Sequence, residues 1–173
     1  MTQTRTGIAR RVAVAAAAAL TAAGLAAGAG AAQGADDQTP LHELRTANNQ
    51  GWFYTLNAGE AQRAVSQLGF HPSATFGALH TAAAPGRQAV HRLRDKTRAS
   101  YMLSISPRET GDARFVDEGI LGYIDTAQHP GEQQLLRYSN HGQWRVLSDA
   151  PANIENMKRA GYQVDGPLGW ARP

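Results

Sequence analysis

The stretch APGRQAVHRL at residues 84–93 recurs 45 residues later as HPGEQQLLRY at residues 129–138. Pro, Gly, Gln and Arg coincide in the two copies, and the apolar positions agree. An earlier copy, LHELR at residues 41–45, aligns with VHRLR at residues 90–94. Self-similarity at a fixed spacing is the sequence signature of internal repeats. The sequence therefore predicts three units, over residues 41–82, 89–127 and 134–172.

Local patterns within these units predict a strand, a turn, a second strand, a helix and a third strand. In the first unit, Asn48-Asn49-Gln50-Gly51 is typical of a hairpin turn. Asn57, followed three residues later by Glu60, indicates a capped helix start. The expected buried helix face is Ala61, Val65 and Leu68. The fold class predicted is α+β: three pseudo-repeats of strand–strand–helix–strand that share one core around a pseudo-threefold axis.

Two motifs carry a family resemblance. The string Gly51-Trp52-Phe53-Tyr54-Thr55 and the closing element Glu118-Gly119-Ile120-Leu121-Gly122-Tyr123 resemble a secreted bacterial and fungal repeat domain of unknown function. The resemblance covers nearly all of residues 41–172, but Trp52 stands where that family usually has His. It implies an extracellular accessory or binding domain, with no catalytic residues to carry over.

The N-terminal segment has the three parts of a secretory signal. Residues 2–11 are polar and basic, an Ala-rich apolar run extends from Val12 to about Ala27, and small residues follow up to Ala32. The run is shorter than the ~20 residues that a spanning helix needs. We therefore expect a signal peptide over residues 1–31 and a secreted protein with no membrane span after cleavage. A flexible mature N-terminus over 32–40 and a single domain over 41–173 would remain. The pair Arg10-Arg11 leaves the twin-arginine route open, although the general secretory route fits better.

Charge and cysteine content exclude several classes of protein. The chain has 17 Lys and Arg against 14 Asp and Glu, and three of the bases, Arg5, Arg10 and Arg11, lie in the predicted leader. The remaining body is neutral, so no nucleic-acid partner is expected. The absence of Cys excludes disulfide scaffolds, thiol catalysis and Cys-ligated zinc.

Catalytic motifs are absent from the sequence. It contains no Gly-x-Ser-x-Gly elbow, no His-Glu-x-x-His pair, no phosphate loop and no calcium loop. The acidic pair Asp117-Glu118 lies on a predicted strand, where neighbouring side chains point to opposite faces. We therefore assign no catalytic residue, no metal ligand and no cofactor. The function predicted is a non-catalytic, monomeric binding module for a glycan, the cell envelope or an extracellular protein. The alternative is a small secreted hydrolase or a hydrolase inhibitor.

Aromatic residues beside the predicted turns are the candidate ligand-binding residues. Flat rings with a polar edge suit sugar faces and protein interfaces, although the same strands could use them for the shared core. In the first case Trp52 and Trp144 would be the most exposed rings. The candidate set is Trp52, Tyr101 and Trp144, with Asn48 and Asn140 in the adjacent turns.

Cleavage of the leader is directly testable. The mature secreted protein should begin between Ala32 and Asp37, because Ala29 and Ala31 place small residues at both critical positions of the site. Replacing Ala29 and Ala31 with bulky residues should block cleavage. N-terminal sequencing that finds Met1 or Thr2 on secreted material would contradict this prediction.

Overall fold

The computed structural model describes residues 37–173, and the predicted signal peptide lies outside the described residues. Strands hold 51% of these residues and helices 20%. The strands are β1 Gln38–Arg45, β2 Trp52–Thr55, β3 His71–His80, β4 Arg87–Asp95, β5 Tyr101–Ser104, β6 Phe115–Asp125, β7 Gln133–Asn140, β8 Gln143–Ser148 and β9 Gln163–Ala171. The helices are the 3₁₀ turn η1 Ala47–Asn49, α1 Ala58–Leu68, α2 Pro107–Thr110 and α3 Pro151–Arg159.

Helix α1 begins and ends where its sequence predicts. The Asn57 side chain accepts a hydrogen bond from the Glu60 N–H at 3.0 Å, which satisfies one of the free amides of the first turn. Gly69 ends the helix in the left-handed conformation, with φ of 67°. Helix α2 is a single turn that Pro107 opens and Gly111 ends.

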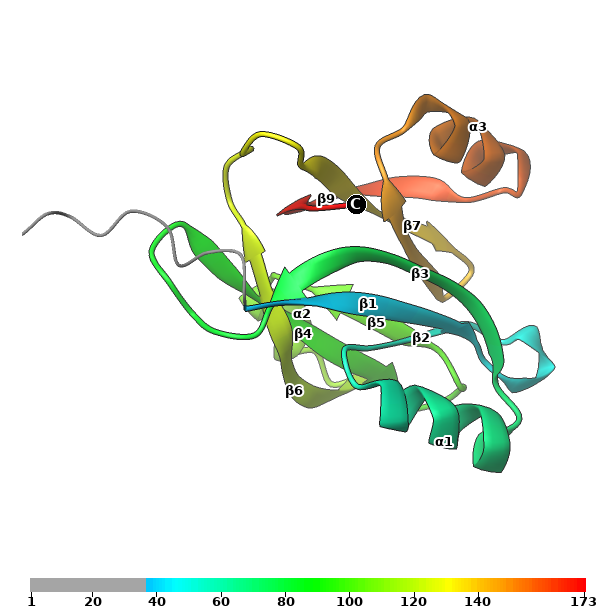
Figure 1. Cartoon of the computed structure of the whole chain (residues 1–173). Helices are drawn as coiled ribbons and strands as arrows, with labels where there is room; N and C mark the ends of the chain where they lie inside the picture. The colour runs from blue at the N-terminus through cyan, green and yellow to red at the C-terminus, as the bar shows by residue number, and fades with distance from the viewer. Residues whose placement is uncertain (1–36) are drawn as a thin grey trace, which may run out of the picture. The chain divides into compact units, whose positions relative to one another are not determined.

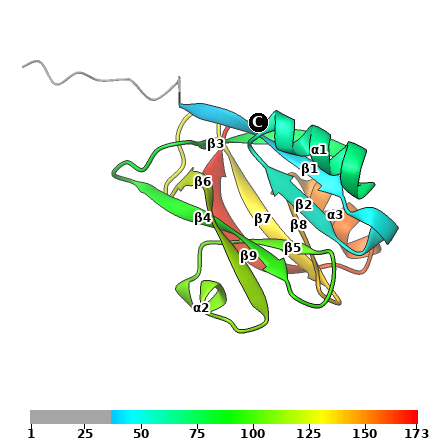
Figure 2. The same cartoon turned by 90° about the horizontal axis from the view of Figure 1, so that it is seen from below.

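All strand pairs are antiparallel, and they join into one sheet. β1 pairs with β2 and β3, β4 with β5 and β6, and β7 with β8 and β9. The far ends of the three long strands then meet one another, as Figure 2 shows for β3, β6 and β9. These junctions are His80 with Tyr123, Asp125 with Trp170, and the isolated bridge of Ala78 with Arg172.

Glycines allow the strands to meet this closely. A Cβ on Gly122 would lie 3.0 Å from the His80 carbonyl oxygen, and one on Gly169 would lie 2.7 Å from the Asp125 carbonyl oxygen. Both neighbours are backbone atoms, which cannot move aside as a flexible side chain can. The Gly that recurs in the closing element of the sequence motif is therefore required by the contact between strands.

The predicted fold class is wrong. The expected α+β arrangement of three pseudo-repeats about a pseudo-threefold axis is replaced by a mostly β structure, one large antiparallel sheet with short helices. The strands β3, β6 and β9 extend beyond their local hairpins and hydrogen-bond to one another, which merges the segments. The helices are too short to form a layer, and α2 has only four residues. β1 also begins at Gln38, inside the segment 32–40 that the sequence predicted to be flexible.

The core has one central cluster and three outer ones. The central cluster takes residues from strands along the whole domain, among them Leu41, Val90 and Leu135. Leu44, Leu93 and Tyr138, which occupy one aligned sequence position, are each buried in a different outer cluster.

The predicted buried face of α1 is confirmed for Ala61 only in part and is wrong for Val65 and Leu68. Figures 1 and 2 show α1 alongside β1 and β2, yet Ala64 is its only buried residue. Val65 is 37% exposed and Leu68 is 57% exposed. Ala64 belongs to one buried cluster with Phe53 and Phe70, Ala61 packs against that cluster, and the rest of the apolar stripe remains exposed. No helix within residues 37–173 combines the length and the apolar character needed to cross a membrane.

The central cluster should dominate stability. Leu135 is 1% exposed, so Leu135→Ala should lower the free energy of unfolding by about 2–5 kcal/mol, because it removes buried methyl groups and leaves a cavity. The control Val164→Ala, at a position 48% exposed, should cost less than about 1 kcal/mol. Equilibrium urea denaturation measures both values, and equal losses would contradict the assignment of the core.

Candidate functional site

Three turns between paired strands meet at one end of the sheet. The Ala99 N–H donates to Gln50 Oε1 at 3.1 Å, and Gln143 Nε2 donates to the Asn49 carbonyl oxygen at 3.5 Å. Arg98 Nη1 donates to the His141 carbonyl oxygen at 2.7 Å, which closes the ring of contacts. We call this surface, formed by residues 46–51, 95–100 and 140–143, the turn face.

The two predicted asparagines belong to the turn face. Asn48 is exposed in η1, with φ of 59°. Asn140 ends β7, and its Nδ2 donates to the Ala160 carbonyl oxygen at 3.3 Å, which ties the turn to the end of α3. The structure thus places both residues in the turns, Asn48 exposed and Asn140 partly buried.

The two tryptophans take the second of the two roles that the sequence left open, a place in the core. Trp52 is 8% exposed and Trp144 is 7% exposed. Trp52 donates its Nε1–H to the Tyr162 hydroxyl at 3.2 Å, and the guanidinium groups of Arg145 and Arg45 lie 4.1 and 4.5 Å from its ring. These contacts cover the ring, because cations favour the faces of indole.

The three candidate rings do not share one surface. Trp144 packs edge-on against Phe115 with ring centroids 5.4 Å apart. Tyr101 is half-buried and packs edge-on against Phe53 at 4.9 Å. Trp52 belongs to the central cluster. The structure distributes the rings over separate hydrophobic clusters rather than assembling them into a platform.

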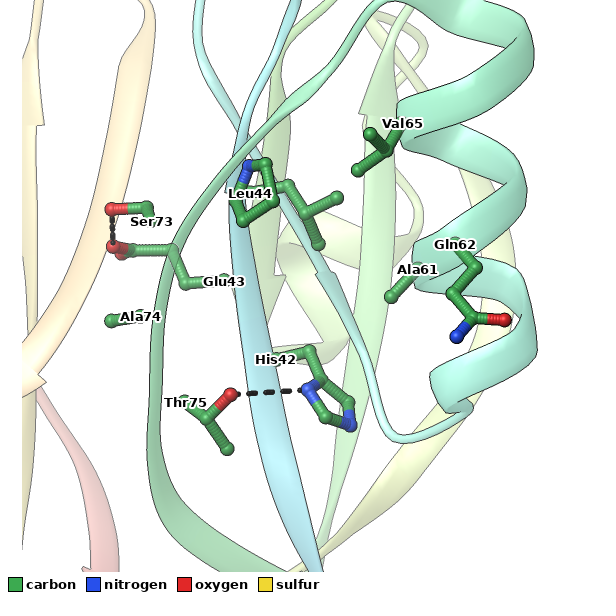
Figure 3. Close-up of a pocket in the computed structure, with 10 residues that line it drawn as sticks. His42, Glu43, Leu44, Ala61, Gln62, Val65, Ser73, Ala74 and Thr75 are labelled. Atoms are coloured by element: carbon green, nitrogen blue, oxygen red, sulfur yellow. Dashed lines mark hydrogen bonds between the residues drawn. The ribbon is translucent and has the colours of Figure 1, made fainter.

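A groove that sequence reasoning missed lies between α1 and the β1–β3 pair. Its volume is about 500 Å³. Figure 3 shows Leu44, Ala61 and Val65 facing the gap between helix and strand, with Gln62 beside it. The periodicity of Ala61, Val65 and Leu68 was the available signal, but it was interpreted as a buried face.

Polar groups mark the strand side of this groove. His42 Nδ1 lies 3.2 Å from Thr75 Oγ1. Figure 3 shows the Glu43 side chain turned away from the helix toward Ser73, whose hydroxyl donates to Glu43 Oε1 at 2.9 Å. The groove is therefore mainly apolar with a few polar groups, as is common for ligand sites.

Behind the groove, Glu43 belongs to a buried polar cluster. The Tyr54 hydroxyl donates to Glu43 Oε2 at 3.1 Å and accepts from the Val146 N–H at 2.9 Å. Arg145 donates to both carboxylate oxygens, at 3.0 and 3.2 Å. Burial raises the pKa of the Tyr54 hydroxyl, which keeps it protonated and able to donate.

Other carboxylates are held in similar ion pairs. Arg137 binds both oxygens of Glu109 at 2.7 Å, and hydrogen bonds from Arg137 hold the pKa of the Glu109 carboxyl below its usual value. Asp117 contacts His91, and Glu118 contacts Arg92 and Arg94. These carboxylates contact arginine or histidine side chains of other elements, an arrangement suited to holding the strands together.

One group of side chains could hold a cation. Ligand atoms of Asp125, His129 and Glu132 lie within 4.8 Å of one another. Asp125 already contacts His80 Nε2 at 2.8 Å, and Glu132 accepts the His129 N–H at 2.8 Å. Asp125 and Glu132 are thus already bound by protein groups, and we assign no metal to this cluster.

The fold and the groove together define an antiparallel β-sheet protein with a surface cleft suited to a ligand. The chain belongs to a family described as a domain of unknown function, DUF5648, whose model matches residues 15–112 and, separately, residues 40–171. Searches among curated proteins and among solved structures found no significant match.

The buried position of Trp52 predicts a structural role. Trp52→Ala should lower the free energy of unfolding by about 3–5 kcal/mol, because it removes a large side chain from the central cluster. Trp170→Ala, at a partly exposed ring, is the control and should cost less. Thermal and urea melts measure both variants, and a wild-type melting curve for Trp52→Ala would show that the ring is not part of the core.

Proposed function

We propose that this protein is a secreted, non-catalytic module that binds an extended segment of another extracellular protein in the groove between α1 and the β1–β3 pair. The observation that carries the proposal is the apolar stripe of α1. Val65 is 37% exposed at the groove, although its position on the helix is one that ordinarily faces a core. An apolar surface left open beside a cleft is typical of interaction sites.

The lining of the groove favours a protein segment over a glycan. Sugar recognition relies on the flat faces of aromatic rings, and the lining residues include no Trp, Tyr or Phe. Aliphatic contacts come from Leu44, Ala61 and Val65, which suit an aliphatic side chain of a peptide. An aromatic platform for sugar binding would also need exposed rings, which Trp52 and Trp144 do not provide.

The strand beside the groove offers backbone hydrogen bonds. Within residues 37–173, β3 pairs with β1 along one edge, while its other edge meets strands only near Ala78 and His80. The N-terminal part of β3, including Ser73 and Thr75, therefore presents an open edge. An extended peptide can add to such an edge and place alternate side chains in an adjacent pocket.

Export and the tandem organisation rest on the sequence alone. The basic start, apolar run and small residues before Ala32 support secretion by the general route. The matching residues of 41–82, 89–127 and 134–172 support tandem sequence units of about 40 residues within the family.

Selection from a phage-displayed library of random peptides tests the proposed function. Enriched peptides should carry an aliphatic anchor and should bind Val65→Glu at least about tenfold more weakly, because the anchor would meet a charge in the groove. Gln67→Glu adds the same charge to the same helix outside the groove lining and should bind like the wild type.

Two results would overturn this function. One is a library that yields no enriched peptide. The other is a set of peptides that binds Val65→Glu and wild type equally well, with both proteins showing the same melting temperature. Retention of the protein on a polysaccharide resin, unaffected by Val65→Glu, would favour a glycan ligand at another surface.

A further inference from the structure

Two arginine side chains lie against Gly142 of the turn face. One is Arg98, which belongs to the turn face, and the other is Arg114, which directly precedes β6. A Cβ on Gly142 would lie 2.9 Å from Arg98 Nη1 and 2.9 Å from Arg114 Nη2. Arg98 Nη1 and Arg114 Nη2 are thus within twice that distance of each other, and both lie against a residue that has no side chain. Gly142 has φ of 81°, a conformation that favours glycine, and the two guanidinium groups occupy the space that a side chain would need.

The charge of this arginine pair is only partly compensated. Asp95 has a fully buried side chain and contacts Arg114 Nη2 at 2.7 Å, whereas Arg98 Nε is 3.9 Å from the same oxygen. The other Asp95 oxygen accepts from the N–H and the hydroxyl of Thr97. The single buried carboxylate of Asp95 is therefore the counter-charge for two guanidinium groups, and both of its oxygens already accept hydrogen bonds.

Both guanidinium groups face solvent and retain unused donors. The side chain of Arg98 is 41% exposed and that of Arg114 is 43% exposed. Each guanidinium carries five N–H donors. Arg98 donates to the His141 carbonyl oxygen, and Arg114 donates through Nε and Nη2 to Asp95.

Aromatic packing and neighbouring charges define the position of the pair. The Arg114 guanidinium lies 4.9 Å from the Trp144 ring centroid, which fixes its plane. Lys96, exposed in the same turn, adds a third cation. The nearest acid in the sequence, Asp112, accepts the Arg114 backbone N–H, and within residues 37–173 its carboxylate forms no ion pair with either guanidinium.

We propose that Arg98 and Arg114 form a binding site for a tetrahedral oxyanion, the phosphate or sulfate group of an extracellular ligand. Two planar guanidinium groups can each donate a pair of parallel hydrogen bonds to such a group. The anion would bind, beside Gly142, to N–H groups that the two guanidiniums do not use within the protein, and would relieve the repulsion between the cations. Trp144, predicted from the sequence to contact ligand, acts here as a support for Arg114.

The test uses inorganic phosphate and inorganic sulfate as probes, in separate titrations at constant ionic strength balanced with chloride. The Gly142 amide and the Nε–H signals of Arg98 and Arg114 are followed by NMR. Saturable shifts of these signals are expected in at least one titration. The anion that saturates at the lower concentration distinguishes a phosphate-bearing from a sulfate-bearing ligand.

Two variants separate a site from general charge attraction. Arg98→Gln leaves Asp95 paired with Arg114, so the fold should be kept while the apparent affinity falls by about tenfold or more. Arg172→Gln removes the same charge beyond the far end of β9 and should change affinity by less than about twofold. Arg98→Lys keeps the positive charge but lacks the paired N–H donors of a guanidinium, so its apparent affinity should lie between those of the wild type and Arg98→Gln.

Three outcomes would overturn the proposal. These are shifts that grow linearly without saturation, equal weakening by Arg98→Gln and Arg172→Gln, and shifts reproduced by chloride alone. A melting temperature of Arg98→Gln close to that of the wild type ensures that loss of binding reflects the missing guanidinium.

Discussion

Two partly buried guanidinium groups link the successive units of the chain, residues 41–82, 89–127 and 134–172, and the arrangement of the sheet depends on these links. Arg92 of β4 contacts Glu60 of α1 and Glu118 of β6, each at 2.9 Å. Arg137 of β7 contacts Glu109 at 2.7 Å and Asp165 at 3.0 Å in the same manner. Removal of one carboxylate would leave a partly buried guanidinium with less charge compensation, which would lower the free energy of unfolding. Each arginine therefore makes the position of one segment depend on that of the segment before it.

The first unit, residues 41–82, lacks an arginine at this position, and the groove lies on this unit. Glu43 of β1 aligns in sequence with Arg92 and Arg137, so the sign of the charge is reversed. Its partner is Arg145 of β8, at 3.0 Å, rather than a carboxylate on α3. The Glu43 carboxylate points inward and contacts Arg145 and Ser73. His42 and Leu44 therefore line the side of β1 that faces α1. The groove lies there.

Sequence reasoning succeeded where the determining contacts are local. The start of α1 at Asn57 and its end at Gly69 follow from capping and backbone conformation. It failed where contacts join distant segments. The pairing of Asp125 with Trp170 merges the segments into one sheet, and no local pattern encodes that pairing. Trp52 is covered by Arg145, which lies far along the chain.

The neutral charge of the body conceals an uneven local distribution, and this affects how the turn face behaves. Most exposed carboxylates on the strands are consumed by pairing, as Glu118 is by Arg92 and Arg94. At the turn face there are more cations than carboxylates, since Asp95 is shared by Arg98 and Arg114. Screening over about 10 Å in moderate salt makes such local imbalances matter more to a small anion than the total charge does. A balanced count of acids and bases therefore argues against a broad polyanion footprint, and it leaves room for a single oxyanion site.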